Sequence, residues 1–596
     1  MTKDSAGIAA PAAPGGIEER RLRRYLATMA DALGGSPLRR PLILLAAGIF
    51  AVILATAYGQ IVLNGWNKPF YDALQRRDMP AFLAQLLVFL KIAGALLALN
   101  VAQLWLNQTL HLRLREALTR DMIDEWLVPG RAFRVARQGQ IGVNPDQRLH
   151  EDTHHLCDLS VDLGVGLLQA SVLLASFVGV LWALSSGFVF HLWGEAFQIP
   201  GYMVWAAILY SGTASWLSWM VGRPLIALNG ERYAREADLR YSLVRVNEQI
   251  DAISVSSGEA DEARRLQLDL AAVIAAARRI VSATVRLAWV TSGYGWVTIV
   301  APIVIAAPVY FGGDMTFGGL MMAVGAFNQF HASLRWFVDN IGAIADWRAT
   351  LRRVAAFRLA LLDAEKADDA ASRVTLAHSP EPAIVLDGLE METPTGAVRL
   401  SEPLVTVHPG ERVLVTGAMG AGKTLLTHTL ASLWCRGRGT VRLPEDGGMA
   451  FLVRDPYLPS GTLRAALSYP RDADAYPAGE IGDCLRRVGL ERLIPSLDRS
   501  ARWEHEFGNN ERRMLSLAQL LLHRPRWIVI DDVDDLLTGN GRTRVASLLR
   551  SDLAEAAILG MGTGEDRTGL FTHTLRLVPV QADGAGGRTV SSTSRL

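Results

Sequence analysis

Residues 417–424 read Gly417-Ala418-Met419-Gly420-Ala421-Gly422-Lys423-Thr424, which is the spacing of a phosphate-binding loop. A β-branched run, Arg412–Thr416, precedes this loop, and a helix-forming run begins near Lys423. The glycines let backbone N–H groups close around phosphate oxygens, Lys423 reaches the β and γ phosphates, and the hydroxyl of Thr424 is a ligand for Mg²⁺. A chance glycine-rich turn is the alternative, and the strand–loop–helix context disfavours it. We predict nucleotide binding.

A second apolar strand, Trp527–Asp531, ends in a carboxylate farther along the chain. This pattern fits the Walker B strand, whose aspartate holds Mg²⁺ through water. Because any buried parallel strand can end in aspartate, the pattern has weight only together with the phosphate loop. From Ala383 onward, strands and helices alternate as in an α/β domain. The C-terminal part is therefore predicted to be an α/β P-loop nucleotide-binding domain in which Asp531 is a metal ligand.

The composition indicates a membrane part joined to a soluble part. Of the 596 residues 50% are hydrophobic and 20% are charged, too apolar for an ordinary soluble protein and too charged for a pure membrane bundle. Lys and Arg (60) nearly balance Asp and Glu (59), so no basic field suggests a nucleic-acid partner. The three cysteines follow no metal-ligand or redox spacing.

Six apolar runs are each long enough to cross a bilayer as a helix, which takes about 20 residues. They are Pro41–Leu63, Leu83–Trp105, Val161–Leu184, Tyr202–Val221, Val285–Tyr310 and Phe317–Val338. A short loop, Asn64–Ala81, joins the first two, whereas long polar connections follow the second and the fourth. Arginines place the first long connection in the cytosol. Because helical periodicity persists in both connections, for example over Ala234–Ile253, we expect the membrane helices to extend far into the cytosol.

These patterns divide the chain into five segments. We predict a flexible leader with a basic elbow helix over 1–40, a transmembrane domain of six helices over 41–369 and a polar linker over 370–382. The nucleotide-binding domain then covers 383–581, and 582–596 form a tail rich in Gly, Ser and Thr that we expect to be disordered.

Four stretches of the membrane part carry a distinctive pattern. They are Leu63–Gln75 (LNGWNKPFYDALQ), Asn144–Arg148 (NPDQR), Phe311–Leu320 and Trp336–Asn340 (WFVDN). With them the chain resembles the SbmA/BacA family of bacterial ABC-type transporters and, more distantly, the peroxisomal acyl-CoA transporters of ABC subfamily D. The nucleotide-binding domain also matches, for example in Pro456–Arg464.

The resemblance implies an ABC transporter half with a six-span exporter-type membrane domain in the bacterial inner membrane and a cytosolic nucleotide-binding domain. It implies a dimer, formed with a second copy or with an intact half. Each of two ATP molecules would lie with Mg²⁺ between one protomer's phosphate loop and the other's signature segment. The transported solute would be bulky: a peptide, a cobalamin-like compound or a long-chain acyl compound.

Several family motifs are altered in this sequence. Arg454 stands where the Q-loop has Gln, and Asp532 stands where the catalytic residue is Glu. The switch His aligns with Thr563. The signature segment aligns with Gly508, Asn509, Asn510 and Glu511, so its Ser becomes Gly508 and a Gly becomes Asn510. Because Asp is one methylene shorter than Glu and a general base needs heavy atoms at about 2.6–3.2 Å, we predict that ATP is hydrolysed slowly.

Two other functions fit the same sequence. Some SbmA/BacA relatives lack the nucleotide-binding domain and are proton-driven, so the chain could be a secondary transporter with a vestigial domain. A regulatory pseudo-ATPase that senses nucleotide is the third hypothesis. Polar residues of the sixth span, Asn328, Gln329, His331 and Arg335, either line a translocation path or make structural hydrogen bonds. His154 and His155 are interpreted as part of a solvated helix face. The substrate and the direction of transport stay open.

Overall fold

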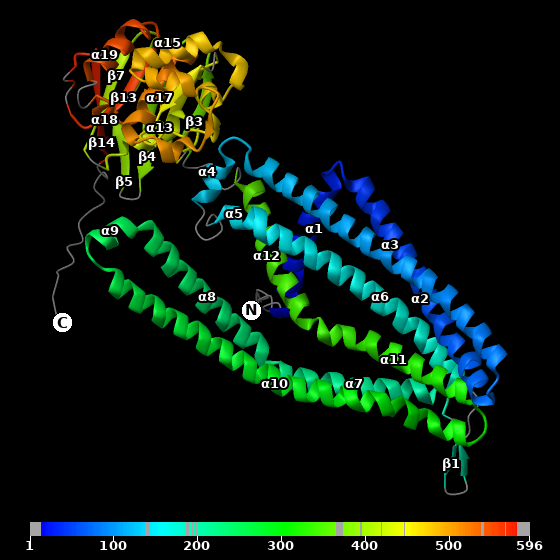
Figure 1. Ribbon diagram of the computed structural model, residues 1–596. Helices are drawn as coiled ribbons and strands as arrows, with labels where there is room; N and C mark the ends of the chain where they lie inside the picture. The colour runs from blue at the N-terminus through cyan, green and yellow to red at the C-terminus, as the bar shows by residue number, and fades with distance from the viewer. Residues whose placement is uncertain are drawn as a thin grey trace, which may run out of the picture. The chain divides into compact units, whose positions relative to one another are not determined.

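The computed structural model describes residues 14–137, 144–185, 190–192, 195–197, 199–364, 373–393, 396–418, 420–434, 436–445, 448–537, 542–564, 566 and 568–580. Met419 and the predicted tail, 582–596, lie outside these residues. The chain forms two compact units. The membrane unit comprises Met1–Trp126 with Gly139–Ala360, and the nucleotide-binding unit comprises Leu127–Gln138 with Leu361–Leu596 (Figure 1).

The membrane unit is almost entirely helical. Its elements are α1 (Pro14–Gly35), α2 (Arg39–Arg76), α3 (Met79–Trp126), α5 (Pro145–Gln147), a π-helical turn (Arg148–Asp152), α6 (Thr153–Ser185), β1 (Phe190–Leu192), β2 (Glu195–Phe197), α7 (Tyr202–Gly222), α8 (Pro224–Glu248), α9 (Ile250–Val255), α10 (Glu259–Phe311), α11 (Phe317–Asp339) and α12 (Ile341–Asp363). Each of the six apolar runs falls within one helix. As predicted, α3 and α10 continue far beyond their apolar runs, and α8 lies alongside α10 (Figure 1).

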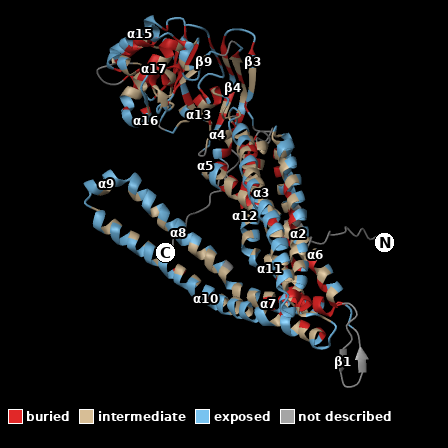
Figure 2. Cartoon of the chain, turned by 45° about the vertical axis from the view of Figure 1, so that its right-hand side comes forward, coloured by how far each residue is buried: buried red, intermediate tan, exposed pale blue. Residues whose placement is uncertain are grey.

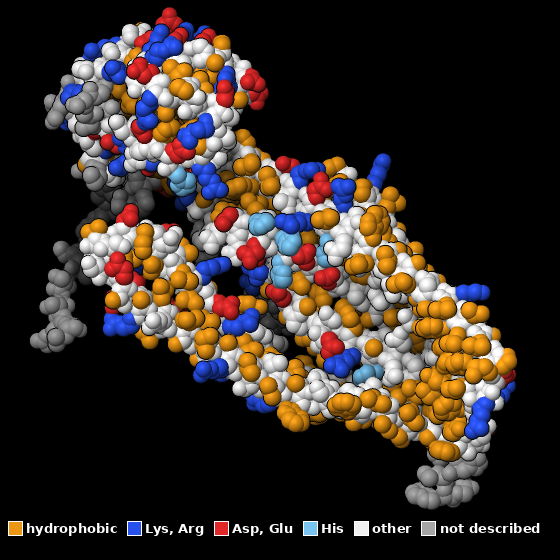
Figure 3. Space-filling model, viewed as in Figure 1, with side chains coloured by type: hydrophobic (Ala, Val, Ile, Leu, Met, Phe, Trp, Pro, Cys, Tyr) orange, Lys and Arg blue, Asp and Glu red, His pale blue; other side chains and the backbone are white. Residues whose placement is uncertain are grey.

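Four of these helical segments are long and apolar enough to cross a membrane: α2, α3, Pro145–Ser185 and α10. Figure 3 shows apolar side chains along the outer face of α2 and α3, where Leu44, Leu87 and Trp105 are exposed. Apolar surface of this extent indicates contact with lipid. The fourth and sixth runs form α7 and α11, and polar or small residues (Ser, Thr, Gly, Asn and His) interrupt the apolar sequence of these helices. Their membrane crossing stays a prediction.

The prediction of a loop over Asn64–Ala81 is wrong. Helix α2 continues to Arg76, and only Arg77 and Asp78 separate it from α3. Arg77 adopts left-handed backbone angles that end α2, and the carboxylate of Asp78 accepts the N–H of Ala81 in the first turn of α3. Of the polar residues in Asn64–Arg76 that suggested a loop, Asp72 bonds to the start of α11, and Asn64 and Asn67 lie beside Gly325 of α11.

These contacts form the α2–α11 interface. The carboxylate of Asp72, which is 7% exposed, accepts the N–H of Gly318 (2.8 Å) and the hydroxyl of Thr316 (3.1 Å) at the start of α11. A Cβ at Gly318 would lie 2.1 Å from the carbonyl oxygen of Lys68. The close approach of the two helices therefore requires glycine at this position.

The nucleotide-binding unit is built on a twisted mixed sheet. Its strands are β3 (Thr375–Ser379), β4 (Ile384–Thr393), β5 (Gly396–Leu400), β6 (Leu404–Val407), β7 (Arg412–Thr416), β8 (Gly437–Pro444), β9 (Met449–Leu452), β12 (Trp527–Ile530), β13 (Ala557–Gly562) and β14 (His573–Pro579). They follow the order β3-β8-β4-β5-β14-β7-β13-β12-β9, with β6 paired to β4. Part of the expected linker 370–382 is thus strand β3, which pairs in parallel with β8.

Helices pack against the sheet, and the buried side chains form two core clusters, seen as the red interior of this unit in Figure 2. The helices are α4 (Arg131–Ala136), α13 (Lys423–Leu430), α14 (Leu463–Ser468), α15 (Ala478–Val488), α16 (Trp503–Glu506), α17 (Asn509–His523), α18 (Val533–Leu536) and α19 (Arg542–Ser551). Trp503 and Trp527 are among the largest fully buried side chains. The apolar strands β7, β12 and β13 are buried because helices cover both faces of a parallel sheet.

Candidate nucleotide-binding site

Four loops that carry the predicted motifs meet at one edge of the sheet. Strands β7, β13, β12 and β9 are consecutive neighbours and run parallel, with Gly562 opposite Thr416 and Ile530 opposite Leu452. The loop after β7 is the phosphate loop, and those after β13, β12 and β9 begin with Thr563, Asp531 and Val453. Ligands of α/β sheets bind outside the carboxyl ends of the strands. The strand order therefore brings the predicted residues together.

The phosphate loop has the backbone that its sequence predicts. Gly420 and Gly422 have φ angles of 82° and 89°, which side-chain-bearing residues seldom adopt. A Cβ at Gly422 would also lie 3.0 Å from Val398. Helix α13 begins at Lys423, whose ammonium donates to the carbonyl oxygens of Gly417 (2.7 Å) and Ala418 (3.0 Å). The loop is thus closed around its own lysine, beside the first turn of a helix.

A cavity of about 440 Å³ opens in front of this loop. Its lining includes Gly420, Gly422, Lys423, Thr424, Arg454, Asp531, Asp532, Asp534 and Thr563. Asp531 is fixed at the end of β12, because its N–H donates to the carbonyl of Leu452 (2.9 Å) and its carboxylate accepts the hydroxyl of Thr427 (3.2 Å). The predicted phosphate, metal, Q-loop, catalytic and switch positions therefore face a single space.

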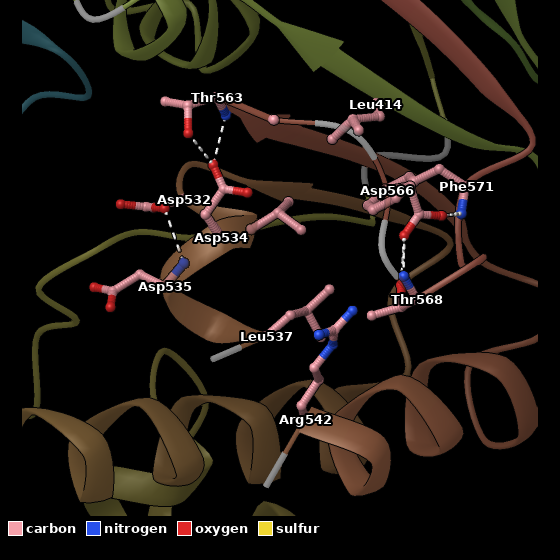
Figure 4. A pocket seen from close by; sticks show the side chains of 12 residues that line it. Leu414, Asp532, Asp534, Asp535, Leu537, Arg542, Thr563, Asp566, Thr568 and Phe571 are labelled. Carbon is pink, nitrogen blue, oxygen red and sulfur yellow. Dashed lines mark hydrogen bonds between the residues drawn. The ribbon is translucent and has the colours of Figure 1, made fainter. Parts of the chain in front are cut away.

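The residues at the predicted catalytic and switch positions, Asp532 and Thr563, form hydrogen bonds within or to the loop after β12 (Figure 4). The carboxylate of Asp532 accepts the N–H of Asp535 (3.1 Å) and so caps helix α18. The carboxylate of Asp534 accepts both the hydroxyl (2.6 Å) and the backbone N–H of Thr563. The side chain of Thr563 thus bonds to a residue that the sequence reasoning did not single out.

Arg454 lies beyond the end of β9 with its side chain exposed. Its carbonyl oxygen accepts from the guanidinium of Arg513 (3.4 Å), and Arg513 is paired with Asp535. The predicted Mg²⁺ ligands fit the ion, because the hydroxyl of Thr424 and the carboxylate of Asp531 are oxygen donors at the same cavity. Arg454 does not fit, because a guanidinium carries only N–H donors, offers no lone pair to a metal and repels a cation.

The predicted signature segment lies at the start of α17. Glu511 accepts the N–H of Gly508 (3.3 Å) and is paired with Arg492, whereas Gly508, Asn509 and Asn510 are exposed. These four residues are not in the lining of the phosphate-loop cavity. Their predicted contact with a nucleotide held by a second protomer stays a prediction.

A short helix from the first long connection belongs to the nucleotide-binding unit. Phe133 of α4 contacts the ring of His428 on α13, with centroids 5.0 Å apart, and the guanidinium carbon of Arg137 lies 3.6 Å from the centroid of the Phe133 ring. Burial lowers the pKa of His428, as does the nearby Arg137, whereas Asp531 opposes this shift. Helix α4 therefore contacts the helix that begins with Lys423.

The membrane unit contains a histidine cluster that the sequence analysis missed. His111 of α3 lies between Asp158 (3.1 Å) and Asp162 (3.2 Å) of α6. The side chains of His154 and His155 are 46% and 45% exposed, as the solvated-face interpretation expects, but His155 also bonds to Asp346 of α12 (2.7 Å).

Two polar residues of α11 bond to neighbouring helices: His331 to Ser211 (2.8 Å) and Gln329 to Gln60 (3.2 Å). Such contacts agree with structural hydrogen bonds.

Comparison with known proteins supports this architecture. The family described as ABC transporter transmembrane region 2 matches residues 34–311. The chain is 26% identical over 521 residues to the Escherichia coli inner membrane ABC transporter ATP-binding protein YddA, covering 87% of this chain and 91% of that protein. It is 25% identical over 592 residues to ABC transporter D family member 2, chloroplastic, of Arabidopsis thaliana, covering 88% and 81%.

Among solved structures, a bacterial Atm1-family ABC exporter with ATP bound has a similar fold. The TM-score is 0.64 at 13% sequence identity, and the match covers 89% of this chain and 91% of that chain. The predicted combination of an exporter-type helical membrane domain with an α/β nucleotide-binding domain is confirmed.

Proposed function

Because the chain is an ABC half-transporter related to subfamily D, we propose that it binds ATP and moves a bulky solute across the bacterial inner membrane with slow hydrolysis. The solute classes are those of the resemblance: a peptide, a cobalamin-like compound or a long-chain acyl compound. One observation carries the proposal. Four residues of the phosphate loop (Gly420, Gly422, Lys423 and Thr424) line the same cavity as Asp531. The residues at the predicted Q-loop, catalytic and switch positions (Arg454, Asp532 and Thr563) line it as well.

The retained residues account for binding. Backbone N–H groups of the phosphate loop and the first turn of α13 attract phosphate oxygens, and Lys423 adds a positive charge. When Mg²⁺ is bound, it supplies charge neutralisation between the β and γ phosphates, and Thr424 and Asp531 would hold it. These groups are sufficient for affinity.

The altered residues account for slow turnover. Asp532 is shorter than glutamate and caps α18 with its carboxylate, so its reach toward an attacking water is reduced. Thr563 cannot supply an imidazole, and its hydroxyl bonds to Asp534. In a homodimer both composite sites would combine these changes with Gly508 and Asn510. An intact partner half would repair each site only in part.

ATPase activity of the purified chain in nanodiscs tests the proposal, with Lys423→Ala as the control. We expect slow turnover in the unmodified chain and nucleotide affinity at least about tenfold weaker in Lys423→Ala, the effect of losing one charged hydrogen-bond donor. Turnover at about 10 s⁻¹, an ordinary enzyme rate, that disappears in Lys423→Ala would refute slow hydrolysis. Equal nucleotide binding by both proteins would refute the site.

The histidine cluster favours a second candidate, a proton-driven transporter with a vestigial nucleotide domain. In this cluster His111 of α3 contacts the carboxylates of Asp158 and Asp162 on α6, and chains of His and Asp on membrane helices form the proton relays of pumps and transporters. Solute uptake into vesicles that survives Lys423→Ala but is lost with an uncoupler or in His111→Asn would support this function. ATP binding without any transport would instead identify a regulatory pseudo-ATPase.

A further inference from the structure

Arg454 places a permanent positive charge in the phosphate-loop cavity. It shares the lining with Lys423, Thr424 and Asp531. Guanidinium stays protonated at any physiological pH, and its planar fork of N–H donors matches phosphate oxygens in pairs. A glutamine at this position, as in the related family, has no charge. The substitution therefore adds one full cation to the wall of the site.

The backbone of Arg454 is fixed, whereas its side chain is available. Arg513 bonds to its carbonyl oxygen and is itself paired with Asp535 on α18. Within the described ranges, the guanidinium of Arg454 makes no hydrogen bond or ion pair with another residue, and the residue is exposed. A charged group on a fixed backbone, without a protein partner, can bind an anion in the cavity without first breaking a salt bridge.

The other charges of the cavity do not provide that partner. Asp534 is engaged by the hydroxyl and N–H of Thr563, and Asp532 caps α18. Asp531 accepts the hydroxyl of Thr427 beside the phosphate loop. None of these carboxylates bonds to the guanidinium of Arg454, so the guanidinium is free to bind the phosphate chain of a nucleotide, whose β and γ groups Mg²⁺ neutralises in most P-loop proteins.

We propose that Arg454 binds the nucleotide phosphates directly and supplies part of the charge that Mg²⁺ otherwise provides, so that this chain takes up metal-free nucleoside triphosphate or diphosphate. The inference rests on the proposed nucleotide binding at this site. It assigns the Q-loop position a binding role in place of metal sensing. It also agrees with slow turnover, because the metal-free triphosphate lacks the cation that stabilises charge in phosphoryl transfer.

The test is a titration of the full chain in nanodiscs with a fluorescent ATP analogue, in excess Mg²⁺ and in EDTA. We expect the dissociation constant of the unmodified chain to differ by less than about threefold between the two conditions. Arg454→Gln should weaken binding in EDTA by about tenfold, the loss of one charged hydrogen-bonded contact, and should change binding in Mg²⁺ much less. Arg454→Lys should fall between the two.

Two controls separate the possible failures. Arg438→Gln removes one exposed arginine from β8, outside the lining of the cavity, and should leave both constants unchanged. If the unmodified chain loses about tenfold or more in EDTA, or if Arg454→Gln binds in EDTA as the unmodified chain does, the inference is wrong although nucleotide binding stands. If no nucleotide binds under either condition, or Lys423→Ala binds equally well, the proposed function itself fails.

Discussion

In the membrane unit, two polar residues of the stretch Leu63–Gln75 are buried at a helix interface, whereas in the nucleotide-binding unit several residues at the predicted motif positions are exposed. Asp72 is 7% exposed and Asn64 is 5% exposed, both against α11. Arg454, Thr563 and Gly508 are exposed at the sheet edge or at the start of α17. Asp72 is hydrogen-bonded to the start of α11, and Asn64 lies beside Gly325 of the same helix. The exposed residues face open space or a cavity.

The difference explains which residues can change without loss of the fold. Replacing a buried, hydrogen-bonded carboxylate leaves its donors unsatisfied and destabilises the packed structure. Replacing an exposed residue at a strand end changes the chemistry of the site and little else, since surface substitutions usually alter stability by less than about 0.5 kcal/mol. The nucleotide-binding unit can thus lose hydrolysis and keep its fold, while the membrane unit has no such freedom at α2.

The largest effect is expected in the membrane unit. Gly318→Ala would place a Cβ 2.1 Å from the backbone carbonyl oxygen of Lys68, which cannot move without shifting α2. We expect a destabilisation of about 2–3 kcal/mol, as for other overpacked interiors. It would be measured as a lower melting temperature in detergent and a lower yield of folded protein.

Gly293→Ala is the matched control, because a Cβ there meets no atom within 4 Å on α10. This variant should melt at the same temperature as the unmodified chain or slightly higher, since alanine favours helix over glycine by up to about 1 kcal/mol. Equal melting temperatures for Gly318→Ala and Gly293→Ala would show that α2 and α11 do not approach as closely as described.

In the nucleotide-binding unit, we expect substitutions at the predicted motif positions to change the ATPase rate and not the stability of the fold. A variant that combines Arg454→Gln, Gly508→Ser, Asn510→Gly, Asp532→Glu and Thr563→His restores the family residues. Its ATPase rate should rise about a hundredfold, within the range that a positioned general base contributes. The steady-state rate in nanodiscs and the melting temperature are measured on the same preparation. The melting temperature should change by less than about 2 °C.

Adding Lys423→Ala to this combined variant should abolish the gained activity. A rise of less than about twofold in the combined variant would show that the altered residues do not limit hydrolysis. A large drop in melting temperature would contradict the view that exposed motif positions are free to change.

Much of the fold follows from the sequence. The predicted strand Arg412–Thr416 is β7, and each apolar run lies in one helix. Both could be predicted because the pattern of apolar residues within a short window indicates the type of element. The stretch Asn64–Arg76 was misjudged, since Asn64, Lys68 and Asp72 look like loop residues until their contacts with α11 are known. Strand β3 was missed for a similar reason: its partner β8 lies far along the chain.

The candidate site was predictable as a set of motifs but not as an arrangement. The sequence identified Lys423, Asp531 and Arg454, whereas their common cavity follows from the strand order β7-β13-β12-β9. The bond between Thr563 and Asp534 depends on the geometry of two adjacent loops. The pairing of His111 with Asp158 depends on the register of α3 against α6, which no local pattern specifies.

The smallest predicted effect concerns the contact between α4 and α13. His428, at this contact, is half-buried and so lies between the buried and the exposed residues compared above. Burial and Arg137 lower the pKa of His428 below its ordinary value, so the docked arrangement favours the neutral ring. The contact with Phe133 should therefore be fully stable above about pH 6.5 and lose stability as the pH falls toward the lowered pKa. After correction for intrinsic rates, hydrogen exchange of the α4 amides should be about two- to fivefold faster at pH 5.5 than at pH 7.5. This pH dependence should vanish in His428→Gln and persist in His408→Gln, which changes an exposed histidine. Protection of α4 that is the same at both pH values would mean that His428 does not control the contact.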